Sequence, residues 1–461
     1  MKTIDHTSIG RAKTLDEMLD ITRLSRAQLG IVAFCGLVAM LDGFDTQAIA
    51  FVAPQIAHHW NVSAGDFGAV FGAGLFGGLV GAVAVGRIAD VAGRKPALLC
   101  AVTLFALATL ATVLVEDVRT LILVRFITGL GLGGALPCFV ALTAEYAPRR
   151  LRTTLVAGVF CGFPFGAVVG GAASAVLLPK IGWQGVFVVA GAAPLLSLPL
   201  LWRFIPESAQ FLMSRGRADE AARIMTRVFP AVRWDGVSHA RNEIKASVAE
   251  LFTPTRATGT LLLWCAFFLS LLLTYFLINW LPLLVARESG DMQNAVLAVV
   301  VLNLGAICGC LLIGRTGDRF GPALVVGAAF AVGAGVIASM GLIGQSTWLL
   351  FSAAFAAGFM SLGAQMCTVA LCAAFYETNL RSTGIGWAVG VGRIGAIAGP
   401  VIGGVLVGGA VDQAILFPLV ALTSLGAAAA VFALRWRLYA SAEGAERPLR
   451  EKRKKMNPRL R

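Results

Sequence analysis

The sequence has few charged residues and few of the side chains that commonly build catalytic or metal sites. Charged residues make up 14% of the chain, and the four histidines, at positions 6, 58, 59 and 239, all lie outside the long apolar runs. A histidine-based catalytic or metal site therefore has little to work with. The nine cysteines lie within apolar runs, where we expect them to pack as small apolar side chains instead of forming disulfides or thiolate metal sites. No cofactor and no enzymatic activity are expected.

A cleavable signal sequence is also missing. The first 26 residues carry four acids and lack a short apolar core followed by a small-residue cleavage site. What the chain has in abundance is apolar surface, because hydrophobic residues make up 57% of it and its mean hydropathy is +0.80. The 53 glycines suit helices that pack backbone to backbone within a bilayer. The composition therefore predicts an integral membrane protein.

Apolar runs long enough to cross about 30 Å of hydrocarbon, roughly 20 residues each, predict twelve transmembrane helices. They begin near residues 28, 63, 96, 120, 153, 183, 257, 291, 322, 347, 382 and 412. A polar stretch divides them six and six, so the predicted class is an all-α integral membrane protein. The expected parts are an N-terminal tail (1–26), a first six-helix half (27–203), a central insert (204–256), a second half (257–439) and a basic C-terminal tail (440–461).

The placement of basic residues predicts the orientation of these helices. Of the 38 lysines and arginines, 33 lie in the tails, the central insert and the loops on one side, whereas the opposite loops hold only Arg119, Lys180 and Arg287. By the positive-inside rule, both termini and the insert are cytoplasmic. This asymmetry also accounts for the net charge of +13 without a nucleic-acid partner. The lipid bilayer is the expected surrounding of the chain.

The two halves share loop sequences. The segment 86–96 recurs in a shorter form at 314–322, and the pair of Glu145 and Arg149 recurs as Glu377 and Arg381, all 228 to 232 residues further on. The matched spacing indicates duplicated six-helix halves. We expect charge pairs of Asp90 with Arg94 and of Asp318 with Arg319 to hold the cytoplasmic end of the bundle closed. The gate residues are then Asp90, Arg94, Asp318, Arg319, Glu145, Arg149, Glu377 and Arg381; the alternative is simple topogenic charge.

Two acids lie inside the first span. Asp42 and Asp45 share a helical face, and each costs about 3 kcal/mol at the centre of a membrane helix on insertion scales, which favours a functional role. Both lie past the midplane on the outer side, and Arg125 lies at a similar depth in span 4. An ion pair of Asp45 and Arg125 is therefore plausible. Protonation of the aspartate would release the arginine and change the preferred helix packing; the alternative is a permanent structural ion pair.

Arg393 lies about 18 Å into span 11, counted from Arg381, and so close to the midplane. Its guanidinium suits two-point binding of a substrate carboxylate, although it could instead pair with Asp42 or with backbone carbonyls. Tyr275 and Asn279 share a face of span 7 and adjoin Trp280. With Gln365 of span 10 they are candidates to surround an apolar ring. For each aromatic side chain packing is the alternative, and Trp280 could be an interface anchor.

Several segments resemble the major facilitator superfamily: the twin loops, Arg125-Phe-Ile-Thr-Gly129, and Pro206-Glu207-Ser208. Asp42-Gly-Phe-Asp45 and the span 11 segment 390–400 are similar to the aromatic acid/proton symporters. The resemblance covers spans 1 to 12 and implies the major facilitator fold. It also implies proton-coupled uptake of aromatic carboxylates, such as benzoate or hydroxybenzoates, across the inner membrane of a bacterium by a monomer. In that family a span 1 acid and a span 4 arginine take part in proton coupling, which favours the switch over a structural pair.

Other functions remain open. A drug/proton antiporter of the same fold would carry a Gly-Pro-x-x-x-Gly-Gly run in span 5, where this chain has Gly162-Phe-Pro164-Phe-Gly166. Transport of a sugar or of another organic anion is a further alternative, and Arg393 near the midplane argues against a sugar. An enzyme lacks an evident nucleophile with a base, and a sensor lacks an added signalling domain.

Overall fold

The computed structural model describes residues 24–229, 247–254, 256–343 and 346–456, and every regular element in these ranges is helical. Residues 1–23 of the predicted N-terminal tail, 230–246 of the insert and 457–461 of the C-terminal tail lie outside the described residues. The elements of the first half are α3 (Arg26–Trp60), η1 (Ala64–Asp66), α4 (Phe67–Ala92), α5 (Arg94–Ala111), η2 (Thr112–Leu114), α6 (Val118–Tyr146), α7 (Arg149–Phe160) and α8 (Gly162–Phe204), followed by α9 (Ala209–Ser214) and α10 (Ala218–Val228). The second half comprises η3 (Val248–Phe252), α11 (Ala257–Ser289), α12 (Met292–Phe320), α13 (Pro322–Met340), α14 (Thr347–Ala357), η4 (Gly358–Leu362), α15 (Gly363–Phe375), α16 (Thr378–Gly408) and α17 (Gln413–Met456).

Among the described residues, eleven helical segments are long and apolar enough to cross a membrane. One of them, Arg150–Phe204, has 55 residues and would extend about 82 Å at 1.5 Å per residue, more than two crossings of a hydrocarbon core of about 30 Å. Its backbone breaks at Gly182, where φ is 67° and ψ is −176°, a conformation that glycine tolerates. Gly182 therefore divides this segment into two membrane-length helices, which gives twelve candidate spans among the described residues.

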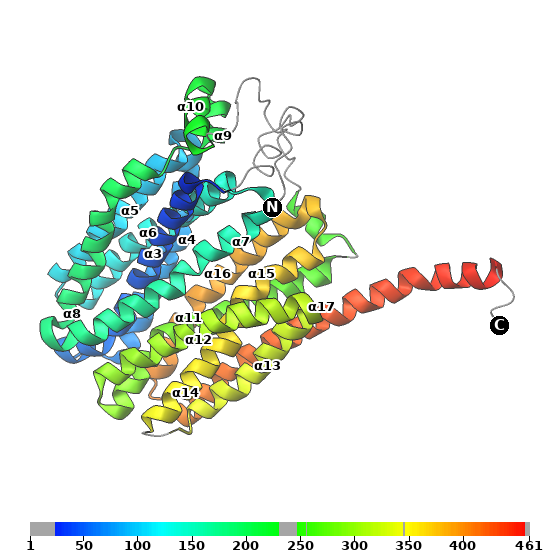
Figure 1. Ribbon diagram of the computed structural model, residues 1–461. Helices are drawn as coiled ribbons and strands as arrows, with labels where there is room; N and C mark the ends of the chain where they lie inside the picture. The colour runs from blue at the N-terminus through cyan, green and yellow to red at the C-terminus, as the bar shows by residue number, and fades with distance from the viewer. Residues whose placement is uncertain (1–23, 230–246, 255, 344–345, 457–461) are drawn as a thin grey trace. The chain divides into compact units, whose positions relative to one another are not determined.

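The chain folds into two compact units. Unit 1 comprises the described residues within 1–243, 278–303 and 400–409, and unit 2 comprises the described residues within 244–277, 304–399 and 410–461. Unit 1 thus contains the first six spans together with parts of α11, α12 and α16 from the second half of the sequence. Within unit 1, α3 packs along α8, α4 packs along α6, and α5 contacts both α6 and α8. The short helices α9 and α10 lie together at the end of this unit where α3 begins (Figure 1).

Glycine contacts explain why these helices pack so closely. A Cβ atom at Gly43 would overlap the backbone of Phe163 in α8, and one at Gly166 would overlap the backbone of Met40 in α3. Because lipid is as apolar as the helices, close backbone packing is a main source of helix association in a membrane. Gly43 lies between Asp42 and Asp45. The same motif that carries the acids therefore also brings α3 against α8.

A second glycine contact in unit 1 joins η1 and the first turn of α4 to the last turns of α16. A Cβ atom at Gly68 would lie 2.8 Å from the Cα atom of Gly404, and one at Gly65 would lie 2.8 Å from the Cα atom of Gly408. Backbone therefore faces backbone along this contact.

Side-chain caps fix where two of the spans begin. Ser25 caps α3 and forms a reciprocal capping box with Gln28, and Asp117 caps α6 by accepting a hydrogen bond from the backbone N–H of Thr120. Hydrogen bonds from the Thr120 hydroxyl and backbone lower the pKa of Asp117 below its ordinary value. The cap of α6 is therefore strongest when Asp117 is ionised.

Unit 2 is also built on close glycine contacts. Gly395 and Gly399 of α16 lie against the backbone of Phe268 and Leu272 in α11, and α13 packs along α17. One turn in the middle of span 10, η4, is π-helical. Such a turn breaks the regular helical ladder, and it is a feature often found at functional sites.

Candidate functional site

The two charged groups predicted to pair in unit 1 do lie together. Asp45 and Arg125 are buried, with 0% and 3% of their surfaces exposed, and 3.8 Å separates Asp45 Oδ2 from Arg125 Nη1. This distance allows an ion pair but is too long for a direct hydrogen bond. Instead, the Thr109 hydroxyl of α5 donates a hydrogen bond of 2.5 Å to Asp45 Oδ1. The carboxylate is thus held by a hydroxyl on one side and faces a guanidinium on the other.

Arg125 has neutral partners of its own. Its Nη2 donates to the hydroxyl oxygens of Thr112, at 3.0 Å, and Thr128, at 3.3 Å, and each of these hydroxyls donates onward to a carbonyl of its own helical segment. The guanidinium also lies over the ring of Phe187, 5.1 Å from its centroid, a favourable cation–π position. The arginine is therefore held by groups whose charge does not change.

Asp42 occupies a different environment from Asp45. It is buried to 7% exposure and accepts a hydrogen bond of 3.1 Å from the Thr46 hydroxyl one turn along α3. The two acids therefore accept hydrogen bonds from different threonines, Asp42 from Thr46 and Asp45 from Thr109.

At the end of unit 1 that carries α9 and α10, charged residues of the shared loops form a network. Arg94 Nη1 lies 2.7 Å from Glu145 Oε2, and Glu145 also accepts hydrogen bonds from the Ser208 hydroxyl and the Gln210 backbone. Glu207 accepts from the backbone N–H groups of Arg94, at 2.9 Å, and of Lys95. A carboxylate therefore sits at the positive N-terminal end of α5.

The expected pairing of Asp90 with Arg94 is wrong. Asp90 is exposed on α4, and its backbone carbonyl, not its carboxylate, accepts a hydrogen bond from Arg215. The reason is the turn at Gly93, whose φ of 106° reverses the chain before α5 begins at Arg94. The reversal directs the arginine side chain toward Glu145 at the end of α6 instead of back toward α4.

The second loop does not repeat this arrangement, and the expected pairing of Asp318 with Arg319 is also wrong among the described residues. Neighbouring residues on a helix point in different directions, and both side chains are exposed, with the guanidinium of Arg319 lying over the ring of Phe320. Glu377 pairs with Arg256 just before α11, and Arg381 is exposed. Arg149 begins α7, and its side chain is outside the described part of the structure.

Two of the predicted substrate residues belong to unit 1. Asn279 is 3% exposed and Trp280 is fully buried. The indole N–H of Trp280 donates to the carbonyl oxygen of Pro400 at 3.1 Å, and its ring meets that of Phe71 edge to face, with 5.5 Å between centroids. These contacts favour the packing interpretation of Trp280.

The other three predicted substrate residues belong to unit 2. Arg393 and Tyr275 are half-buried on helices that run side by side, because Gly395 contacts Phe268 and Gly399 contacts Leu272. This register places Tyr275 about nine residues, or about 14 Å, further along the axis than Arg393. A single small substrate could touch both only if their long side chains extend toward each other. Gln365 is half-buried in α15, just after the π-helical turn.

Several contacts were not predicted from the sequence. Threonines 109, 112 and 128 surround the buried ion pair, yet a threonine in a membrane helix commonly donates to its own backbone and gives no signal. Glu207 was singled out only by its motif. A reciprocal amide pair was missed as well: Asn303 Nδ2 donates to Gln47 Oε1 at 3.0 Å, and Gln47 Nε2 donates back at 3.3 Å. The presence of an asparagine or glutamine within a span was the sequence feature that could have indicated this hydrogen-bonded pair.

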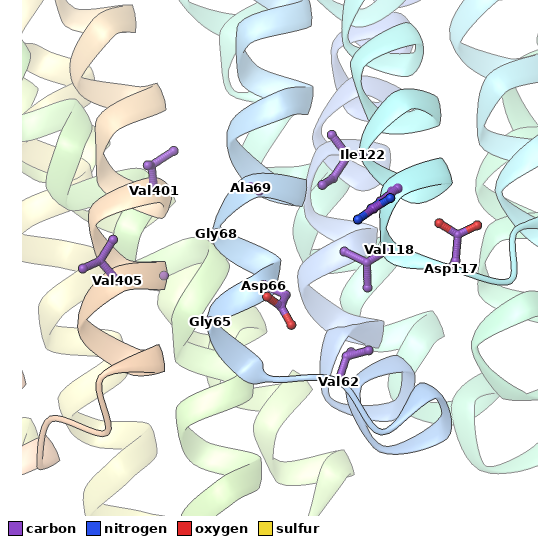
Figure 2. A pocket seen from close by; sticks show the side chains of 12 residues that line it. Val62, Gly65, Asp66, Gly68, Ala69, Asp117, Val118, Ile122, Val401 and Val405 are labelled. Atoms are coloured by element: carbon purple, nitrogen blue, oxygen red, sulfur yellow. The ribbon is translucent and has the colours of Figure 1, made fainter.

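An open pocket of about 750 Å³ lies beside the glycine contact of α4 and α16 (Figure 2). Val401 and Val405 flank Gly65 and Gly68 on one side, and residues of α6, including Ile122, lie on the other. Asp66, Asp117 and Arg119 complete its polar part. Its lining includes neither Asp45 nor Arg125, so this pocket is separate from the buried ion pair.

A twelve-span helical bundle with a buried carboxylate, a buried guanidinium and repeated charged loops defines a multi-pass membrane transporter. The family model for the Major Facilitator Superfamily matches residues 35–342 and 263–460. The chain belongs to this superfamily and, within it, to the aromatic acid/proton symporters that its span 1 and span 11 motifs resemble. It is a transporter and not an enzyme.

Named relatives cover most of the chain. The gallate transporter of Pseudomonas putida is 36% identical over 421 residues, 90% of this chain and 94% of the relative. The 4-hydroxybenzoate transporter PcaK of Pseudomonas aeruginosa is 38% identical and covers 84% of this chain and 87% of the relative. The benzoate transport protein of Acinetobacter baylyi is 32% identical over 86% of this chain and 87% of the relative.

Solved structures with the same fold are more distant in sequence. The xylose transporter XylE from E. coli, in a partially occluded inward open conformation, has a TM-score of 0.64 and 19% identity, and it covers 88% of this chain and 97% of its own. At this identity the likeness shows the fold alone, and it confirms the predicted major facilitator architecture.

Proposed function

We propose that this protein takes up aromatic carboxylates, of the benzoate and hydroxybenzoate class, together with protons across the inner membrane of a bacterium. The observation that carries the proposal is the buried Asp45–Arg125 pair, because a carboxylate inside a span can exchange a proton as helices repack. The names of the relatives support the substrate class. In alternating access the substrate site opens to each side of the membrane in turn, and an inward proton gradient supplies the direction of net transport.

In this proposal Asp45 binds the transported proton and Asp42 is the alternative carrier. Arg393 receives the substrate carboxylate, because a planar guanidinium near the middle of span 11 can make two parallel hydrogen bonds to it. Tyr275, Asn279 and Gln365 are proposed to surround the ring, whereas Trp280 packs against Pro400 and Phe71. The proposed gate at the cytoplasmic end comprises Glu145 with Arg94, Glu377 with Arg256, and the remaining loop charges.

Uptake into liposomes tests the proposal. Purified protein is reconstituted with an inward proton gradient, and accumulation of labelled benzoate, 4-hydroxybenzoate, gallate and xylose is measured. We expect accumulation of one or more of the acids but not of xylose, and loss of that accumulation when the gradient is collapsed. Asp45→Asn should abolish accumulation, and any residual exchange should no longer depend on pH. Gradient-driven accumulation by Asp45→Asn would show that another group carries the proton.

The same reconstituted protein tests Arg393. Wild type should bind 4-hydroxybenzoate far more tightly than the uncharged 4-hydroxybenzamide, and Arg393→Gln should bind both weakly and about equally. Losing one partner of a desolvated charge pair costs about 2 to 5 kcal/mol, which is roughly 30-fold to several-thousand-fold in affinity. If the Arg393→Gln variant still preferred 4-hydroxybenzoate over the amide, another residue would bind the carboxylate.

A further inference from the structure

The two oxygens of the Asp45 carboxylate have different surroundings. Oδ1 accepts the hydrogen bond from the Thr109 hydroxyl at 2.5 Å, whereas Oδ2 faces Arg125 Nη1 at 3.8 Å. Within the described part of the chain, no donor lies within hydrogen-bonding distance of Oδ2. Oδ1 is therefore occupied and Oδ2 has unused capacity to bind a proton.

We propose that Thr109 is a positioning residue for proton coupling: by holding Oδ1, it fixes the rotamer of Asp45 so that Oδ2 binds and releases the transported proton. This inference rests on the proposed function, in which Asp45 carries that proton. The step balances simply, because one proton adds to the carboxylate at Oδ2 and the same proton later leaves it. Thr109 keeps its own proton throughout.

The contacts of Arg125 also determine which helix is held less tightly when Asp45 is protonated. The ionised Asp45 is attracted to Arg125 and accepts from Thr109, but Arg125 is held by the hydroxyls of Thr112 and Thr128 and by the ring of Phe187. These partners are neutral and remain when Asp45 is protonated. Protonation therefore weakens the hold on α3, while the arginine stays in place between α6 and the end of α5. This differs from the sequence-based expectation that the arginine is released.

The charges that face Asp45 are few, so its response to Thr109 should be measurable. From α6 it faces the guanidinium of Arg125, and from α5 it accepts from the hydroxyl of Thr109; Thr112 and Phe187 contact the arginine. Asp42 is the other acid of its own helix, three residues earlier. Hydrogen bonds to an ionised group are stronger than those to a neutral one, so a hydroxyl at position 109 favours the ionised carboxylate.

The test replaces Thr109 by valine, which has the same shape without the hydroxyl, and by serine, which restores it. Uptake of labelled 4-hydroxybenzoate into liposomes is measured at fixed internal pH and fixed membrane potential while the external pH is varied. Wild-type uptake should fall as external pH rises and Asp45 loses its proton. In Thr109→Val the midpoint should move upward by about 1 to 2 pH units, because a hydrogen bond to a charged group contributes about 1.5 to 3 kcal/mol. Thr109→Ser should return it toward the wild-type value.

Thr103→Val is the matched control, because Thr103 lies on the same helix and its hydroxyl donates to the Leu99 carbonyl. It should keep the wild-type midpoint. In the Asp45→Asn background, adding Thr109→Val should leave the remaining exchange unchanged at every pH. A Thr109→Val midpoint equal to wild type, in protein that elutes as a single folded species, would overturn the inference. Wild-type uptake that does not depend on pH would instead overturn the proposed function.

Discussion

Gly43 joins two properties of one short motif, because it separates the two acids of span 1 and also allows α3 to touch α8. A methyl group at this position would overlap the Phe163 backbone, which cannot move aside as a flexible side chain would. We expect Gly43→Ala to destabilise the protein by about 3 kcal/mol or more, at or above the upper end of the usual cost of overpacking. Thermal unfolding of the detergent-solubilised protein would show a lower Tm.

Gly36 provides the control for this prediction. It lies two turns earlier on α3, and a Cβ atom there would meet no atom within 4 Å. Gly36→Ala should keep or raise the Tm, because alanine favours a helix by up to about 1 kcal/mol over glycine. Equal losses for Gly36→Ala and Gly43→Ala would contradict the view that the α3–α8 contact is responsible.

At the scale of a single element, α5 depends on Glu207 at its first turn. The carboxylate accepts from the N–H groups of Arg94 and Lys95, which the helix itself leaves unpaired. Removing it with Glu207→Ala should lower the free energy of unfolding by about 1 to 2 kcal/mol, whereas Glu207→Gln keeps an acceptor and should cost less. The measurement is the Tm of the full-length protein.

Glu116 is a suitable control residue, since it is an exposed glutamate outside this network. Glu116→Ala should leave the Tm within error of wild type. If Glu207→Ala behaved in the same way, the carboxylate would not stabilise α5.

Sequence patterns predicted the elements better than their contacts. Membrane-length apolar runs specified the spans, and the depth of Asp45 and Arg125 along their helices was enough to bring them together. The partner of Arg94 was missed because it depends on how Gly93 turns the chain, and a glycine in a loop does not specify the direction of the turn. Thr109 was missed for a different reason: its hydroxyl donates across to another helix, whereas those of Thr103 and Thr112 donate within their own helical segments.

For the whole molecule, the distribution of basic residues predicts which face of the membrane each loop occupies. Reporter fusions near Gly93 and Gly444 should report the cytoplasm, and fusions near Asn61 and Asp291 should report the opposite side. The reason is that 33 of the 38 basic residues lie in the segments assigned to the cytoplasm. A cytoplasmic signal from Asn61 would require a different order of spans.

The glycine contact of η1 and α4 with α16 affects what happens when water enters between these helices. Gly65 and Gly68 face Gly404 and Gly408, and none of these four residues has a side chain. Separating the helices at these positions therefore moves no side chain out of a packed site. The N–H of Gly65 donates to the Ser63 hydroxyl, and Gly404 lies inside α16, so water reaching these two residues would not leave their N–H groups without a partner. Parting and rejoining there would need no search among rotamers. Such a contact can separate and re-form repeatedly without rearranging side chains.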